Sequence, residues 1–249
     1  MNAPVAIVQV TARNVLAIKR LLGFGLLTLV PALIFFLSSR TATEQGKVEN
    51  FTGAAVLMFS VVIPIVSIVI SGSVLGTERR GSTLSFLMLR PLSRFTIATA
   101  KLVSAIVSSF AIAAIGSVAL GALATITIGD FSYLTASVVG TLIAVAGYSA
   151  VFMPLGYLTE RATLIGFIYI FVWEAAVAGI ILGLSGTSLW RIAASAFEAL
   201  ASGGLESDII EAATGSLAPG VGGAIFKMGA LCLISIAFTG WLLRTRDLT

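Results

Sequence analysis

Six apolar runs, each about as long as a bilayer crossing requires, constrain the fold of this chain more than any other feature. The hydrocarbon core of a membrane is about 30 Å thick, so a crossing helix needs roughly 20 mainly apolar residues. Only 10% of the residues are charged, whereas a soluble domain carries about 25%. The sequence therefore predicts an all-α integral membrane protein, with residues 1-249 forming a single transmembrane domain. The six predicted spans cover about residues 21-38, 53-76, 101-128, 135-158, 163-185 and 221-243.

The first twenty residues have helical periodicity but are too short and too polar to cross a bilayer. The apolar positions recur at helical spacing beside Arg13, Asn14 and Lys19; they are Val8, Thr11-Ala12 and Val15-Leu16. An apolar stripe flanked by cations is typical of a helix that lies in the plane of the interface. We therefore expect residues 1-20 to form an interfacial helix.

A second amphipathic region separates the fifth and sixth predicted spans, over residues 186-220. Its first part, Leu189 to Leu200, places apolar residues on one helical face, opposite Arg191 and Glu198. Its second part, Glu206–Ala213, is shorter and acidic. We expect two short external helices that rest on the membrane surface.

The distribution of cations predicts the orientation of the chain. Eleven of the fifteen Lys and Arg residues fall in four regions: the N-terminus, the segment 77-101, the Glu160–Arg161 link and the C-terminus. Cytoplasmic loops carry the excess of Lys and Arg, so both termini are expected in the cytoplasm. We expect a multi-pass protein of a cell (cytoplasmic or inner) membrane, of prokaryotic type. The positive charge thus follows topology. It forms no basic face with stacking aromatic residues, and we expect no nucleic-acid partner.

Several kinds of catalytic chemistry are excluded by composition. The chain has no histidine, and its single cysteine, Cys232, lies in an apolar run. Residues 183-186 (Gly-Leu-Ser-Gly) match a motif of intramembrane serine proteases, but those enzymes activate the serine with a histidine. We expect a non-catalytic chain with no metal site and no cofactor of its own.

A charged, turn-rich segment at residues 77-100 interrupts the apolar sequence. Ser82 is a suitable N-cap for a short helix, and Pro91 disfavours helical geometry at Arg90, so that helix ends there. Ser93 is then placed to cap the third span. The apolar residues of the short helix share one face: Leu84, Leu87 and Met88. The residues alone fit two interpretations: a plain membrane-anchoring loop, which accounts for the cations, and a docking surface, for which the apolar face is the argument.

These residues resemble a known family. The motif Glu78-Arg79-Arg80-Gly81-Ser82-Thr83-Leu84, followed by Leu87 and by Arg90-Pro91-Leu92-Ser93-Arg94 and Lys101-Leu102, is similar to the hallmark of ATP-binding-cassette (ABC) type-2 permeases. The resemblance extends to Tyr169–Glu174 (YIFVWE) and to Arg244–Leu248 (RTRDL).

The resemblance implies that residues 77-100 form a coupling helix that docks on a separate nucleotide-binding subunit. In such transporters two permeases assemble with two ATPase subunits, and ATP and Mg are bound by the ATPase. The chain has no G-x-x-x-x-G-K-[ST] sequence, so any ATPase must be another polypeptide. The ATPase-coupling residues implied by the resemblance are Glu78, Arg79, Arg80, Gly81, Thr83, Leu84, Leu87, Met88, Arg90, Pro91, Ser93 and Arg94.

Two ionisable residues and two small-residue motifs lie inside predicted spans. Glu174 is either a pathway or gate residue facing a cavity, or a residue near the outer interface where the span bends outward. Lys227 either extends to the outer surface or pairs with Glu174. Gly72-x-x-x-Gly76 and Gly179-x-x-x-Gly183 predict close helix packing.

Together these observations predict the membrane-spanning permease subunit of an ATP-driven ABC transporter, an exporter whose pathway forms in a homodimer or in a dimer with a related permease. The alternative is a non-transporting membrane scaffold or sensor that anchors a cytosolic ATPase. A secondary transporter is disfavoured because intramembrane charges for ion coupling are scarce. Apolar spans look alike whatever they carry, so the residues do not specify a substrate.

Overall fold

The structure, a computed structural model, describes residues 3–80, 93–177, 186–201 and 219–245. Every regular element in these ranges is helical, which confirms the predicted all-α class. The elements in chain order are α1 (Ala3–Val15), α2 (Ile18–Ser39), α3 (Glu44–Leu57), η1 (Met58–Val62), α4 (Ile63–Arg80), α6 (Arg94–Ile128), α7 (Ser132–Leu158), α8 (Ala162–Ile168), η2 (Tyr169–Val177), α10 (Leu189–Leu200) and α12 (Gly220–Thr245).

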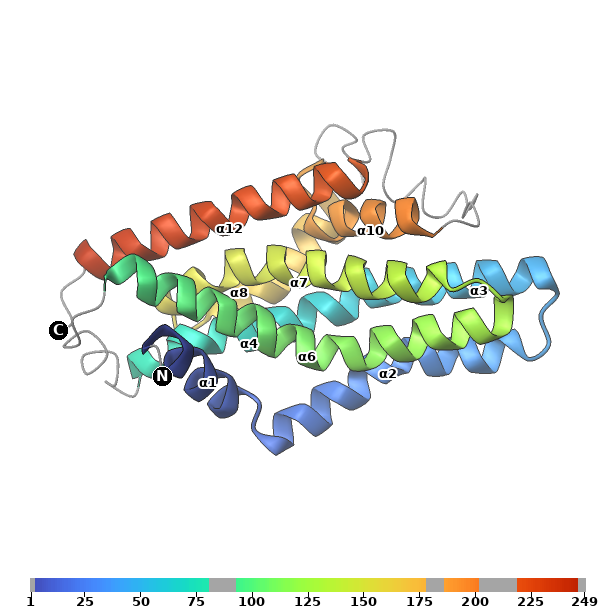
Figure 1. Ribbon diagram of the computed structural model, residues 1–249, viewed down its shortest axis with the longest axis horizontal. Helices are drawn as coiled ribbons and strands as arrows, with labels where there is room; N and C mark the ends of the chain where they lie inside the picture. Colours follow the sequence, from blue (N-terminus) through green and yellow to red (C-terminus); the bar gives the residue numbers. More distant parts are fainter. Residues whose placement is uncertain (1–2, 81–92, 178–185, 202–218, 246–249) are drawn as a thin grey trace.

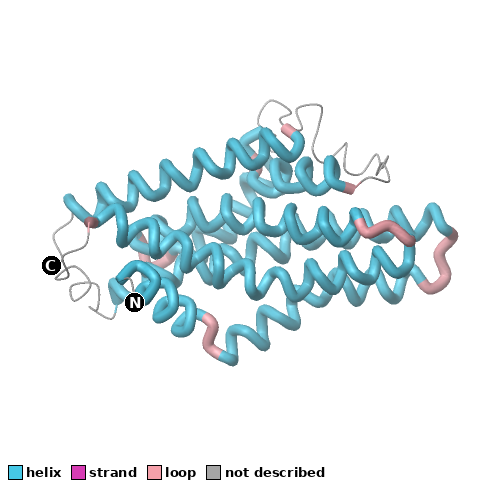
Figure 2. The backbone as a smooth tube through the Cα atoms, in the orientation of Figure 1, coloured by secondary structure: helices cyan, strands magenta, loops and turns pink. Residues whose placement is uncertain are grey.

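The long helices form an elongated bundle (Figures 1 and 2). Helix α7 is central, because it packs against α4, α6, α10 and α12. Helices α2 and α12 lie at the periphery and leave large apolar side chains exposed, including Leu26 and Leu233. An apolar exterior around a packed interior is the arrangement expected of a bundle surrounded by lipid tails.

Five described helices are long and apolar enough to cross a membrane. They correspond to the first four predicted spans and to the sixth. The predicted fifth span, 163-185, is described only in part: α8 and η2 form a shorter apolar helix over Ala162–Glu174, and residues 178–185 lie outside the described ranges. The count of six spans therefore stays a prediction.

The second span is longer than its apolar run. A continuous helical segment of 36 residues, Glu44–Arg79, replaces the predicted 53-76. It begins where the Thr43 hydroxyl accepts a hydrogen bond from the Gly46 N–H at 3.2 Å, an N-cap that an apolar-length criterion does not detect. Polar residues such as Glu44 and Lys47 therefore belong to the helix. A π-helical stretch, η1, immediately precedes Pro64 within it.

The buried face of the N-terminal helix is the predicted one, but its C-terminal boundary differs from the prediction. Ile7, Thr11 and Val15 are buried, and α1 packs along α6 through them. The helix ends at Val15 rather than near residue 20, and α2 begins at Ile18 rather than 21. The two helices meet at a break around Ala17, whose extended backbone separates them.

One expectation about the external segment is wrong. Helix α10 was expected to rest on the membrane surface, yet every residue from Leu189 to Phe197 is buried. It packs against α7 and α12, and Phe197 lies against the rings of Phe51 and Phe59. A wide apolar face can pack in a protein groove as well as on a lipid surface, and here α10 packs in a groove of the protein. The second expected piece, Glu206–Ala213, lies outside the described residues.

The regions expected on the cytoplasmic side lie together. The start of α1, the end of α4, the start of α6 and the end of α12 all lie at the left end of the bundle in Figure 1. The C-terminal end of α2 and the N-terminal end of α3 lie at the opposite end of the bundle. This arrangement agrees with the predicted grouping of α1, the end of α12 and the two helices that flank residues 81–92, while the side of the membrane stays a prediction.

Candidate functional site: the ends of the coupling segment

An ion pair between a buried lysine and a partly exposed glutamate joins the two helices that flank residues 81–92. Lys101, on α6, forms an ion pair and a hydrogen bond with Glu78, on α4. Its ammonium also donates to the hydroxyl of Thr11, on α1, at 2.7 Å. The Lys101 side chain is only 1% exposed and that of Glu78 is 27% exposed. Burying an ammonium group costs several kcal/mol unless partners surround it, so this contact restricts how α1, α4 and α6 can move apart.

Arg79 extends the same contact region to α7. Its guanidinium donates to the main-chain oxygen of Tyr157 at 2.6 Å and lies over the Tyr157 ring at 5.9 Å. Helix α12 joins α6 nearby, where Arg244 lies over the Phe95 ring at 4.7 Å. Four helices, α1, α4, α6 and α7, are thereby connected through the adjacent residues Glu78 and Arg79.

The helix of the third span is capped by the residue that the sequence predicted. Ser93 is the N-cap of α6, and its hydroxyl accepts a hydrogen bond from the Thr96 N–H at 3.1 Å. Arg94 is the first residue of the helix and is half-buried. Arg80 ends the described part of α4. The remaining predicted coupling residues, Gly81, Thr83, Leu84, Leu87, Met88, Arg90 and Pro91, lie outside the described residues.

Sequence reasoning missed part of this contact region. Lys101 was placed among the cytoplasmic cations, but the structure buries it inside the bundle. Thr11 was recognised only as part of the apolar face of the N-terminal helix, and Tyr157 was not singled out. The signal available was the spacing of Lys101, nearly two turns inside α6 and therefore within the apolar part of the helix.

A second buried polar cluster surrounds Glu174, which is 2% exposed. One carboxylate oxygen accepts hydrogen bonds from the Tyr148 hydroxyl at 3.0 Å and from the Leu189 N–H at 3.1 Å. The other accepts from the Ser188 hydroxyl. Tyr169 is a further hydrogen-bonding partner. Both oxygens thus face donors of the protein. The two positions that the sequence raised for Glu174, in a pathway or gate and near the outer interface, both stay predictions.

Neither Lys227 nor Arg191 forms a salt bridge with Glu174, although the sequence raised a pair between Lys227 and Glu174 as an alternative. Lys227 is exposed, and its ammonium lies 3.5 Å from the main-chain oxygen of Gly186. This position fits an extension to the surface. Arg191 was expected on an exposed face but is buried; it lies over the Trp190 ring at 5.4 Å and interacts electrostatically with Glu174.

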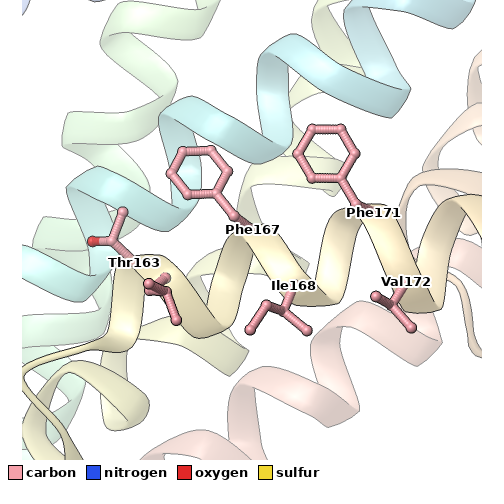
Figure 3. Close-up of a pocket in the computed structure, with 6 residues that line it drawn as sticks. Thr163, Phe167, Ile168, Phe171 and Val172 are labelled. Atoms are coloured by element: carbon pink, nitrogen blue, oxygen red, sulfur yellow. The ribbon is translucent and has the colours of Figure 1, made fainter.

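An open apolar hollow runs along α8 and η2, and Figure 3 shows its lining side chains projecting from this helical segment. Its lining contains no ionisable group and is apolar except for the hydroxyl of Thr163. Within the described ranges no group of three or more His, Cys, Asp or Glu side chains could hold a metal ion. The lining residues are Thr163, Leu164, Phe167, Ile168, Phe171 and Val172.

The bundle of long apolar helices, with its ion pair buried between spans, defines a multi-pass membrane protein. Residues 18–201 match the family model described as ABC-2 family transporter protein. The match covers well over half of the chain, and the chain belongs to this family, as the motif at residues 78–102 indicated. Membership makes it a membrane component of transport and implies a partner ATP-binding subunit. No curated protein and no solved structure matches.

Proposed function

We propose that this chain is the permease subunit of an ATP-driven ABC exporter, which forms its pathway as a dimer and works with two copies of a separate ATPase. The family match supports the transporter class. One structural observation supports coupling: the helices on either side of residues 81–92 are joined by the Glu78–Lys101 ion pair. ATP and Mg are held by the ATPase, and this chain contributes the membrane pathway and the docking segment.

The ion pair gives the proposal its mechanism. Movement of a docked ATPase would displace residues 77-100, and α4 and α6 would receive that displacement at Glu78 and at Ser93. Because Lys101 is buried, separating its ammonium from Glu78 would leave a desolvated charge, and the two helices therefore respond together. Thr11 and Tyr157 pass the displacement to α1 and α7. The proposed side of the membrane for these contacts is the cytoplasm, as the cation distribution indicates.

An ATP-dependent change in the contents of vesicles distinguishes a transporter from a non-transporting scaffold. The permease and its ATPase are reconstituted in vesicles, and a cell extract is added to the outside medium with ATP or with a non-hydrolysable analogue. Complexes whose ATPase faces the medium then move substrate into the vesicles, which are separated from the medium. Mass-spectrometric profiling then compares the solutes and lipids of the two samples. An exporter changes at least one species only with ATP. Equal profiles, with the ATPase still bound, would support the scaffold and overturn transport.

A further inference from the structure

The hydrogen bonds of Glu174 connect three elements that are distant in sequence. Glu174 belongs to η2, Tyr148 to α7, and Ser188 and Leu189 to the start of α10. Ser188 is also the N-cap of α10, since its hydroxyl faces the Arg191 N–H at 3.5 Å. The carboxylate therefore binds a helix N-terminus, where negative charge is stabilised by the unpaired N–H groups and by the helix dipole.

Helix α10 depends on these contacts because it is short. It has 12 residues, and a helix of this length is marginal by itself in water. At its N-terminus Glu174 binds it, and towards its C-terminus Phe197 packs on Phe51 and Phe59, with ring centroids 5.8 and 5.2 Å apart. Between these two points Arg191 is buried and interacts electrostatically with Glu174, so loss of the Glu174 charge also removes a favourable interaction of this cation.

We propose that Glu174 is a positioning residue that holds α10 in its groove as a separately docked element, so that loss of the carboxylate releases α10 while the spans stay folded. Three hydrogen bonds to donors of α7 and α10 converge on two oxygens. An amide in place of the carboxylate removes the negative charge at the N-terminus of α10 and turns the oxygen that faces the Ser188 hydroxyl into a donor. Local opening of one element at lower cost than global unfolding is a general property of folded proteins. The inference goes beyond the transport function and does not depend on it.

Cysteine labelling tests this directly, because Cys232 is the only native cysteine. In a Cys232→Ser background, Ala194→Cys places a thiol on α10, at a position that is 5% exposed. The protein is embedded in nanodiscs, which leave both faces open, and reacted with a membrane-impermeant maleimide. We expect Glu174→Gln to raise the labelling rate at position 194 about tenfold, since a lost charge-assisted hydrogen bond changes an opening equilibrium by about that factor.

Two reporter positions distinguish release of α10 from general unfolding. Ala150→Cys on α7, where the alanine is 2% exposed, should stay protected in the Glu174→Gln variant. Thr41→Cys, at an exposed position, should react at one rate in every background. Parallel exposure of positions 150 and 194 would overturn the proposal, because Glu174 would then support the whole bundle. Continued protection of position 194 would overturn it equally.

A milder pair of variants keeps the test decisive if Glu174→Gln does not fold. Tyr148→Phe removes one hydroxyl that donates to Glu174, and Tyr157→Phe makes the same change on the same helix away from the cluster. Tyr148→Phe should raise labelling at position 194 severalfold, and Tyr157→Phe should leave it unchanged. Equal rates in the two variants would show that the Tyr148–Glu174 bond does not hold α10.

Discussion

At the scale of single residues, the buried ammonium of Lys101 is the group that depends most on its neighbouring partners. It lies in the bundle between the Glu78 carboxylate and the Thr11 hydroxyl. Glu78→Gln would leave this buried cation without its opposite charge, which we expect to lower the free energy of unfolding by about 1–3 kcal/mol. If the pair transmits movement, ATP turnover of the reconstituted complex should also fall severalfold. Thermal unfolding in detergent and a steady-state ATPase assay measure the two effects.

Two further variants show whether the pair itself is responsible. Glu44→Gln removes a carboxylate from the exposed Lys47–Glu44 pair, whose Glu44 side chain is 81% exposed, and should change neither quantity. The double variant Glu78→Gln, Lys101→Met removes both charges and should be more stable than Glu78→Gln alone, because no unpaired buried charge remains. A double variant that is less stable than either single variant, or wild-type turnover in Glu78→Gln, contradicts the account.

The sequence could identify Glu78 but not its partner. The resemblance placed Glu78, Arg79 and Lys101 in one motif, and counting cations placed Arg79 and Lys101 at the cytoplasmic edge. Lys101 pairs with residues 23 and 90 positions away, and such pairing depends on which helices pack side by side. Hydrophobic periodicity gives the buried face of each helix but not its neighbour, so neither Thr11 nor Tyr157 could be predicted as a partner.

At the scale of helices, α4 and α7 approach so closely that only glycine fits at their contact. A Cβ atom added at Gly156 would lie 2.1 Å from the main-chain oxygen of Gly72, which confirms the packing role predicted for Gly72. Gly156→Ala must therefore push two backbones apart, at a cost of about 1–3 kcal/mol. The variant should unfold at a lower temperature in detergent. Gly53→Ala, in α3 with nothing within 4 Å of the added Cβ, is the matched control and should be neutral or stabilising.

The N-cap of α6 provides a second prediction at this scale. Ser93 accepts a hydrogen bond from the Thr96 N–H at the start of a 35-residue helix. Ser93→Ala should destabilise the protein by about 1 kcal/mol, and Ser93→Asp should retain wild-type stability because its carboxylate can accept the same bond. Thermal unfolding of the three proteins compares them. Equal stability of the alanine and aspartate variants would mean that this cap contributes little to α6.

The sequence predicted the Ser93 cap and the apolar stretches better than the surroundings of each helix. Ser93 has a local signature, and the spans are long enough to be recognised by length. Helix α10 was also found, but its apolar face was assigned to the membrane surface. Lipid and a protein groove both bury apolar side chains, so periodicity alone does not distinguish them. The burial of Arg191 and the partners of Glu174 followed from that packing and could not be predicted.

At the scale of the whole molecule, the elements that would meet an ATPase lie at one end of the bundle. The flanks of residues 81–92, the start of α1 and the end of α12 lie at this end (Figure 1). A docked subunit there would touch the segment that joins α4 and α6 and would lie beside α1.

A single charge on the predicted docking face should therefore prevent assembly with the ATPase without affecting the spans. Leu87→Asp would bury an unpaired carboxylate in the groove of the partner, at a cost of several kcal/mol, and we expect the ATPase to be lost during purification. Ser85→Asp adds the same charge to the same segment off the face formed by Leu84, Leu87 and Met88, and should keep the partner. Native mass spectrometry of the wild-type complex should give two permeases and two ATPases, and both variants should insert into the membrane normally. Normal recovery of the ATPase with Leu87→Asp would exclude this face as the docking surface, because a desolvated charge cannot be accommodated there without loss of affinity.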